Sequence, residues 1–216
     1  MSEQSPIVIL ISGRGSNMRA ILEAQLPVTV AAVISNEPEA EGLIFAREMG
    51  IATRLLDHRS FPNRLDYDKK LIDVIEEYAP GLVVLAGFMR ILTPLFVNHF
   101  KHRLINIHPS LLPAFTGLHT HQRALKAGVK VHGCTVHFVT EELDAGPIVA
   151  QAAVPVLSQD DENSLAQRVL NEEHIIYPRV INWWAQGRLQ WRDNHTVVIV
   201  PFDNPQQALI APSLNS

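Results

Sequence analysis

The sequence is poor in cysteine and in net charge, and both shortages narrow the class of protein. Cys134 is the only cysteine among 216 residues, so the chain cannot form an internal disulfide, and a cysteine-ligated metal cluster is not expected. Because Cys134 lies in an apolar, strand-like run, we expect a buried and inert thiol. The net charge of −4 provides no basic surface, so a nucleic acid is not expected as a main partner.

Long hydrophobic runs are missing as well. No stretch approaches the roughly 20 apolar residues that cross a bilayer, so no membrane partner is expected. The start of the chain, Met1–Pro6, has neither the basic residues nor the small-residue cleavage site of a signal peptide. These observations predict a soluble, cytoplasmic protein.

The chain does contain enough apolar sequence for one sizeable core. Hydrophobic residues make up 47% and charged residues 19% of the sequence, which is typical of a folded globular domain. No internal repeat or linker divides it. We therefore predict a single domain over residues 1–200, followed by a flexible, poorly ordered polar tail at 201–216.

Strand-like and helix-like patterns alternate along this domain. The predicted strands are 7–12, 28–35, 52–56, 82–86, 104–108, 131–140 and 148–156, with short strands at 189–191 and 197–200. The predicted helices are 17–25, 41–49, 64–78, 94–100, 119–127 and 164–184. Alternation favours a parallel sheet, whereas the short join 141–147 favours an antiparallel pair. We predict an α/β, Rossmann-like fold whose sheet is mostly parallel but mixed, with helices on both faces.

The turn between the first strand and the first helix, Ser12–Asn17, has the composition of a phosphate-binding loop. Glycines let the backbone approach an anion, and the following helix presents free N–H groups and a positive dipole end. The simpler interpretation is a tight turn with a Ser or Asn cap. The rival is a dinucleotide site, supported by Glu37 near the second strand, but Met18 stands where its third glycine is expected. The pattern favours a monophosphate.

Asn106, His108 and Asp144 carry the chemistry of acyl transfer to an amine. An amide donates to a developing oxyanion, an imidazole moves protons near neutrality, and a carboxylate orients and charges that imidazole. Taken alone, each is more often a capping or structural residue. Asn106 and His108 lie two residues apart on a predicted strand, so their side chains share one face. Together, beside a loop stiffened by Pro109 and Pro113, the three residues indicate catalysis.

Three segments with candidate ligand-binding residues lie at or just after the ends of predicted strands. Ligands of open α/β sheets bind beyond the carboxyl ends of the strands. The turn 12–17 follows the first strand, Gly87–Arg90 follows the apolar run 82–86, and His108 ends a further strand. We therefore expect a common ligand-binding edge, over which the loop of Asp144 could close.

The ordered set of motifs resembles the glycinamide ribonucleotide transformylases, a family of folate-dependent formyltransferases. The matching segments are I-S-G-R-G-S-N, V-V-L-A-G-F-M-R-I-L, L-I-N-I-H-P-S-L-L-P, G-L-H-T-H, H-F-V-T-E-E-L-D-A-G-P-I and E-E-H-I-I-Y-P. They occur in order from the first strand to the long late helix and so span most of the chain. Any one of these motifs would be weak evidence for the family, but the complete set in this order is highly specific for it.

The resemblance implies a transferase of one-carbon metabolism and purine biosynthesis with the formyltransferase fold. Such an enzyme transfers the formyl group of 10-formyltetrahydrofolate, a co-substrate, to the amine of glycinamide ribonucleotide without a metal. The N-terminal half would bind phosphate, and the C-terminal half would hold folate and the catalytic residues Asn106, His108 and Asp144. The residues implied on the ribonucleotide side are Gly15, Ser16, Asn17 and Glu173. The residues implied for folate are Arg64, Met89, Arg90, Ile91, Leu92, Asn106, Thr140, Glu141, Glu142, Leu143 and Asp144.

Two segments depart from the family pattern. Arg14 stands where a small polar residue is expected, and 114–116 differs from the Lys/Tyr/Pro-like loop of the family. Arg14 should help anion binding. The difference at 114–116 bears on the motion of the loop after Pro113 and leaves the implied chemistry unchanged. In the implied mechanism, Asp144 is expected to raise the pKa of His108 by charge proximity and to help relay a proton to the departing folate nitrogen.

The other histidines favour structural roles. His119 and His121 form an H-x-H pair at a helix start, but no third metal ligand is near them in the sequence. His132 and His137 should lie on opposite faces of one strand, so we do not expect them to chelate a metal together.

Other functions remain as alternatives. A formyltetrahydrofolate deformylase would usually carry an N-terminal regulatory domain, and a methionyl-tRNA formyltransferase would need a basic RNA-binding domain. A non-catalytic nucleotide-binding module would leave Asn106, His108 and Asp144 without a role. Both a monomer and a homodimer are compatible with the sequence.

Overall fold

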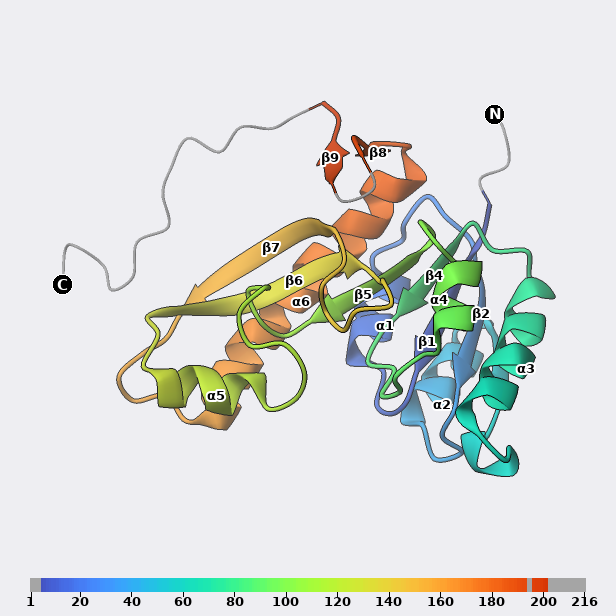
Figure 1. Cartoon of the computed structure of the whole chain (residues 1–216), viewed down its shortest axis with the longest axis horizontal. Coiled ribbons are helices and arrows are strands. Elements are labelled where there is room, and N and C mark those ends of the chain that lie inside the picture. The colour runs from blue at the N-terminus through green and yellow to red at the C-terminus, as the bar shows by residue number, and fades with distance from the viewer. Residues whose placement is uncertain (1–4, 194–195, 202–216) are drawn as a thin grey trace. The chain divides into compact units, whose positions relative to one another are not determined.

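The structure is a computed structural model that describes residues 5–193 and 196–201 (Figure 1). The chain divides into two compact units. The first unit contains the residues up to 106 together with 138–142, and the second contains 107–137 and the residues from 143 onwards. The predicted single domain over 1–200 stays a prediction. Apart from Pro201, the predicted tail lies outside the described residues.

Seven strands form one mixed, mostly parallel sheet, which confirms the predicted α/β fold. Their order is β3-β2-β1-β4-β5-β6-β7. The strands are β1 (Ile7–Ile11), β2 (Val30–Ser35), β3 (Ala52–Leu55), β4 (Leu82–Leu85), β5 (Leu104–His108), β6 (Val131–Phe138) and β7 (Ile148–Pro155). β1 is parallel to β2 and β4, β2 to β3, and β4 to β5, whereas β6 and β7 are antiparallel. The short join 141–147 therefore connects an antiparallel pair, as predicted.

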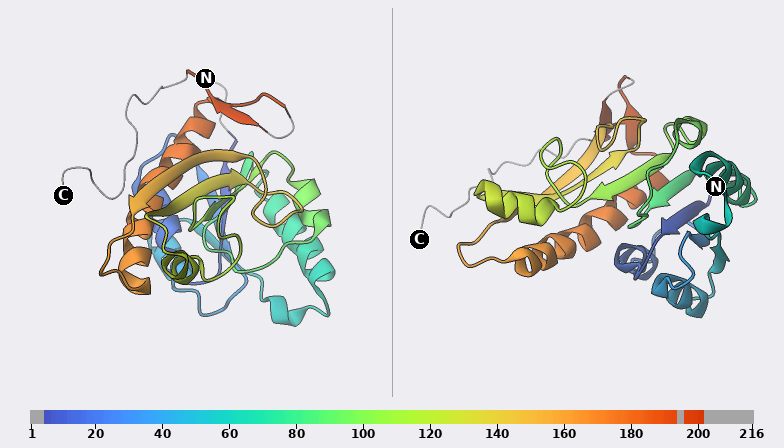
Figure 2. Two further views of the ribbon diagram at one scale, coloured as in Figure 1. Left: turned by 60° about the vertical axis from the view of Figure 1, so that its left-hand side comes forward. Right: turned by 60° about the horizontal axis from the view of Figure 1, so that its bottom comes forward.

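In the first unit, helices cover both faces of the parallel strands. These helices are α1 (Ser16–Glu23), α2 (Glu41–Glu48), α3 (Arg64–Glu76) and α4 (Pro94–His99), with a 3₁₀ turn η1 at His58–Ser60. Val8 of β1 belongs to a core cluster with Tyr67 of α3 and Phe96 of α4, whereas Ile11 lies against Gly42 of α2. The right-hand view of Figure 2 shows α1 and α2 on one side of β1 and α3 on the other. Every side chain of β1 is fully buried, as expected for a central parallel strand.

The second unit contains the antiparallel pair β6–β7 and two helices. Its other elements are α5 (Thr120–Ala127), α6 (Glu162–Ala185) and the antiparallel pair β8 (Leu189–Trp191) and β9 (Val197–Ile199). The apolar side of α6 is buried and includes Leu165, Val169, Ile176 and Val180. Cys134 of β6 is fully buried, and its burial raises the pKa of the thiol to about 12. The predicted burial of Cys134 is confirmed, and a thiol held in its protonated form is a poor nucleophile.

α6 begins two residues before its predicted start at Ser164. The side chain of Asp161 accepts a hydrogen bond from the Ser164 backbone N–H at 2.7 Å, and Ser164 Oγ accepts one from the Asp161 N–H at 3.0 Å. This reciprocal capping box provides acceptors for two backbone N–H groups at the start of the helix, so the helix begins at Glu162. Within the part of the chain that the structure describes, neither α6 nor any other helix has both the length and the apolar character of a membrane span.

Candidate active site

The predicted phosphate turn joins β1 to α1 in the first unit. Gly15 is the N-cap of α1 and has a φ of 70°. The Gly13 carbonyl accepts a hydrogen bond from the Gly42 N–H at 3.1 Å, which ties the turn to the start of α2. Ser16 is half-buried, and Asn17 is buried. The turn therefore leads into the N-terminus of α1, whose positive dipole end is favourable for an anion.

Gly15→Ala should destabilise the protein by about 1–3 kcal/mol. A side chain is unfavourable at this positive φ, and the new Cβ would lie 3.1 Å from the Cα of Gly42. Gly13→Ala is the matched control, because its Cβ would meet no atom within 4 Å and its φ is outside the left-handed region. Urea unfolding measures both variants. Equal unfolding midpoints for the two would contradict this explanation of Gly15.

Glu37, which supported the dinucleotide alternative, already has several partners. Its Oε1 accepts a hydrogen bond from Asn36 Nδ2 at 3.1 Å and lies 3.5 Å from His58 Nδ1. Its Oε2 lies 3.6 Å from Arg59 Nη2. Met18, which replaces the third glycine of a dinucleotide fingerprint, is fully buried beneath the turn. Both observations weigh against a dinucleotide site.

The predicted folate segment 89–92 follows β4 and has no regular secondary structure. Met89 and Ile91 are 74% and 63% exposed, whereas Leu92 packs against the core cluster of the first unit. The guanidinium of Arg90 lies over the Tyr67 ring, with its Cζ 4.6 Å from the ring centroid. A cation–π contact therefore holds the Arg90 side chain, so this residue is not simply a solvated surface charge. The segment presents an apolar surface of the kind that a flat ring system can cover.

The other folate residues predicted in the first unit lie on α3 and on the strand-to-loop segment after β6. Arg64 is the first residue of α3 and is exposed. Thr140 Oγ1 donates to the Glu142 carbonyl at 3.2 Å, and Glu141 Oε1 accepts from Asn98 Nδ2 at 2.7 Å. The two contacts give the first part of this loop a defined conformation.

His108 and Asp144 form a buried pair in the second unit. His108 ends β5 and is 6% exposed, and its Nδ1 lies 3.5 Å from Oδ2 of Asp144. Its Nε2 lies 3.0 Å from the Phe115 carbonyl oxygen. The same Oδ2 of Asp144 accepts a hydrogen bond from the Gly117 N–H at 2.8 Å. Asp144 therefore contacts both the imidazole of His108 and the loop after His108 that contains Gly117. Leu143, the residue before Asp144, is exposed.

Asn106 lies two residues before His108 on β5. Residues i and i+2 of a strand point to the same side, so the amide and the imidazole share one face of β5. Asn106 is half-buried, and it is paired with Leu85 in the register of β4 and β5. The predicted amide and imidazole are thus carried by one short strand.

A buried hydrogen-bond network that sequence reasoning missed holds the loop after His108. Thr135 Oγ1 donates to the Ser110 carbonyl at 2.7 Å and accepts from Leu112 N–H at 3.0 Å and from Gln151 Nε2 at 2.9 Å. Thr135 and Ser110 are both fully buried. The available signal was a threonine inside an apolar strand, because a buried hydroxyl group needs partners.

Glu173 lies on α6 in the second unit, whereas Gly15, Ser16 and Asn17 lie in the first. Glu173 is 7% exposed, which is unusual for a carboxylate. Burial raises the pKa of Tyr177 well above its usual range, and the charge of Glu173 raises it further. Glu173 is therefore a buried acidic group whose charge acts on the neighbouring Tyr177 phenol.

His132 and His137 of β6 are both buried, and His121 stands edge-on to His132 with their ring centroids 5.3 Å apart. Burial lowers the pKa of His132 to about 4, and the neighbouring His121 and His108 lower it as well. Among residues 5–193 and 196–201, no three His, Cys, Asp or Glu side chains are grouped as metal ligands.

The free energy of unfolding should fall as the pH drops from about 6.5 to about 4, partly because of His132. The unfolded chain binds a proton at this residue near pH 6.5, whereas the folded protein binds it only near pH 4. His132→Leu should therefore flatten the pH dependence. His119→Asn, at an exposed histidine with a left-handed backbone, should leave it unchanged. Urea titrations across this pH range compare the variants, and an unaltered slope in His132→Leu would exclude this role.

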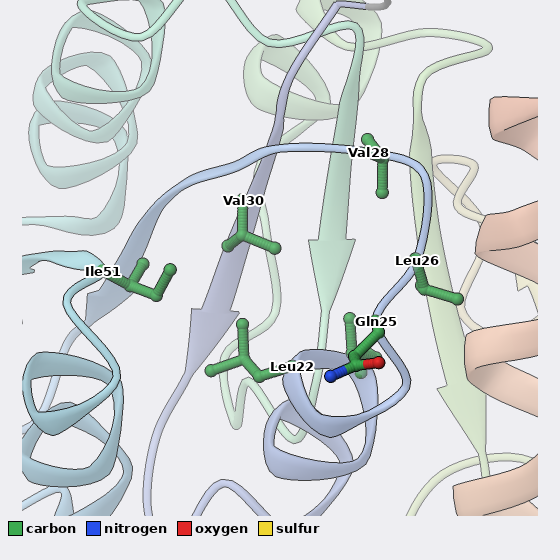
Figure 3. A pocket seen from close by; sticks show the side chains of 7 residues that line it. Leu22, Gln25, Leu26, Val28, Val30 and Ile51 are labelled. Carbon is green, nitrogen blue, oxygen red and sulfur yellow. The ribbon is translucent and has the colours of Figure 1, made fainter.

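A small pocket of the first unit has no part in the candidate site. Its volume is about 150 Å³, and it lies between α1, the loop that follows α1, and β2 (Figure 3). The lining residues are Ile21, Leu22, Gln25, Leu26, Val28, Val30 and Ile51. None of them is a predicted site residue.

The fold and these residues define a member of a known class. Residues 5–181 match the family described as formyl transferase, and the chain belongs to that family. Over 192 residues it is 54% identical to the phosphoribosylglycinamide formyltransferase of Escherichia coli (strain K12), which covers 87% of this chain and 91% of that protein.

Solved structures give the same result. The phosphoribosylglycinamide formyltransferase of Coxiella burnetii is 49% identical and has a TM-score of 0.87, covering 91% of this chain and 94% of that one. Glycinamide ribonucleotide transformylase 1 of Symbiobacterium toebii is 45% identical and has a TM-score of 0.88, covering 92% and 95%. The resemblance identified from the sequence motifs is confirmed.

Proposed function

We infer that this protein transfers the formyl group of a formyl-folate donor to the amine of glycinamide ribonucleotide, a step of purine biosynthesis. Its family and its similarity to phosphoribosylglycinamide formyltransferases over most of both chains support this activity. The structural observation that carries the inference is the buried pair in which His108 Nδ1 lies 3.5 Å from Asp144 Oδ2. An imidazole beside a carboxylate is the arrangement that proton transfer during amine acylation requires.

We propose 10-formyltetrahydrofolate as the donor, and we propose the site residues given above for the two substrates. Exposed Met89 and Ile91 would lie against the flat pterin ring. The N–H groups at Ser16 and Asn17 would bind the ribonucleotide phosphate, and Glu173 would contact the same substrate. A cytoplasmic location, and a monomer or homodimer as the working form, stay predictions.

In the proposed reaction, the amine nitrogen attacks the formyl carbon, and the carbonyl electron pair moves onto oxygen. Asn106 would donate a hydrogen bond to that oxygen, and a protonated His108 would donate a second through Nε2, in place of the Phe115 carbonyl that lies 3.0 Å from it in the structure. Asp144 orients the imidazole and offsets its positive charge. The new ammonium loses a proton, and the folate N10 gains one through His108 or water. The electron pair on oxygen then re-forms the carbonyl, and the bond between N10 and the formyl carbon breaks with its electron pair leaving on N10. The products are formylglycinamide ribonucleotide and tetrahydrofolate, and no step needs a metal ion.

Absorbance of released tetrahydrofolate, recorded with and without glycinamide ribonucleotide, tests this function. Release should require the ribonucleotide. Release that is independent of the amine would indicate a deformylase, and the absence of release under both conditions would favour a non-catalytic binding module.

A further inference from the structure

We propose that Ser12 is a positioning residue that fixes the start of the folate segment through its hydroxyl group. Ser12 is the first residue after β1, and its backbone N–H donates to the Gly87 carbonyl at 3.1 Å. Its Oγ accepts a hydrogen bond from the Met89 N–H at 2.8 Å. One residue at the entrance to the phosphate turn therefore holds the chain on both sides of Phe88. This proposal rests on the proposed function, which assigns Met89 to the folate side.

Asn36 sets the direction of the serine hydroxyl group. Ser12 Oγ donates to Asn36 Oδ1 at 2.5 Å, and Asn36, just after β2, is 1% exposed. The amide nitrogen of Asn36 donates to Glu37 Oε1 at 3.1 Å and lies 3.3 Å from His58 Nδ1. Because the amide nitrogen has these partners, the amide oxygen faces Ser12 and takes the hydroxyl proton. The lone pairs of Oγ are then left for the Met89 N–H.

The remainder of the segment is held by α3. The buried carboxylate of Asp68 accepts a hydrogen bond from the Thr93 N–H at 2.6 Å, and the Arg90 guanidinium stacks on the Tyr67 ring. The backbone between these points has no regular secondary structure, and segments of that kind move unless side chains hold them. Of these three contacts, the one from Ser12 comes from the turn assigned to the ribonucleotide phosphate, whereas the other two come from α3.

A preorganised segment binds its ligand without the free-energy cost of ordering. Ser12→Ala removes the acceptor of the Met89 N–H and leaves every atom assigned to the chemical step in place. We expect the KM for 10-formyltetrahydrofolate to rise about five- to tenfold, the effect of losing one ordinary hydrogen bond. The Kd of tetrahydrofolate, used as the binding probe, should rise by the same factor, while kcat and the KM for glycinamide ribonucleotide change less than about twofold.

Hydrogen exchange supplies a readout that general destabilisation does not produce. In Ser12→Ala, the peptide that spans residues 86–93 should exchange faster, because the Met89 amide has lost its acceptor. Ser12→Thr keeps a hydroxyl group at this position and should restore slow exchange and the wild-type donor KM.

Ser164→Ala is the matched control. The Oγ of Ser164, at the start of α6, likewise accepts a hydrogen bond from a backbone N–H, that of Asp161 at 3.0 Å, and it donates to Asp160 and Asp161 rather than to the network of Asn36 and Glu37. It should lower stability and leave the donor KM and the exchange of 86–93 unchanged. Equal effects of Ser12→Ala and Ser164→Ala, a KM effect confined to glycinamide ribonucleotide, or unchanged exchange in Ser12→Ala would overturn the proposal. A wild-type enzyme that transfers no formyl group would overturn the proposed function, and the exchange experiment would still test Ser12.

Discussion

Asp144→Asn should lower kcat by about 10²–10⁴-fold, the usual range for loss of acid–base assistance. The change removes the negative charge that lies 3.5 Å from His108 Nδ1. It keeps a side-chain oxygen that can still accept the hydrogen bond from Gly117, which is 2.8 Å long in the native protein. The loop should therefore stay in place while the imidazole loses the partner that balances its positive charge.

Asp144→Ala separates these two effects. It removes the charge and the acceptor for the Gly117 N–H together, so it should lower kcat as much as Asp144→Asn and also speed hydrogen exchange in residues 115–119. Steady-state kinetics and exchange are measured on both variants. If Asp144→Asn retains more than about a tenth of wild-type kcat, the carboxylate has no essential part in the reaction.

Asn106→Ala should lower kcat by about 10²–10³-fold, as expected when one donor to an oxyanion is lost. The alanine side chain cannot donate to the oxygen of the tetrahedral intermediate. Asn106 is also one of the residues proposed to contact folate, but the other proposed folate residues remain to bind the donor in the ground state. The KM for glycinamide ribonucleotide should change little, the KM for the formyl donor should rise by far less than kcat falls, and most of the loss in kcat/KM should come from kcat.

The control for this prediction is Asn163→Ala, which removes an exposed amide in the first turn of α6. It should leave both kinetic parameters at their wild-type values. A large rise in KM with unchanged kcat for Asn106→Ala would instead assign Asn106 to substrate binding and would remove it from the catalytic group.

Local sequence signals were sufficient for the order and type of the elements. The wholly apolar run 82–86 became β4, whose four residues are buried, and the short join 141–147 correctly indicated an antiparallel pair within a parallel sheet. Gly50 and Gly128, which directly follow the predicted helices 41–49 and 119–127, adopt φ values of 76° and 68°, as expected of glycines that end helices. The start of α6 was misplaced because the capping residue Asp161 acts together with Ser164, and a pattern of apolar spacing does not report such a pair.

The contacts that hold the candidate site could not be predicted in the same way. Ser12 and Met89 are 77 positions apart, and their hydrogen bond uses a backbone N–H that every non-proline residue has. Likewise, the Phe115 carbonyl at His108 Nε2 leaves no trace in the residue types. Sequence patterns report which side chains can do chemistry, whereas long-range backbone contacts depend on how the strands and loops are arranged.

The fate of the formyl carbon tests the proposed function most directly. 10-Formyltetrahydrofolate labelled at the formyl carbon is incubated with the protein and glycinamide ribonucleotide, and the products are resolved by mass spectrometry. The label should appear on the amine of the ribonucleotide, one equivalent for each tetrahydrofolate released. Label recovered as free formate, with the ribonucleotide unmodified, would contradict formyl transfer to the amine.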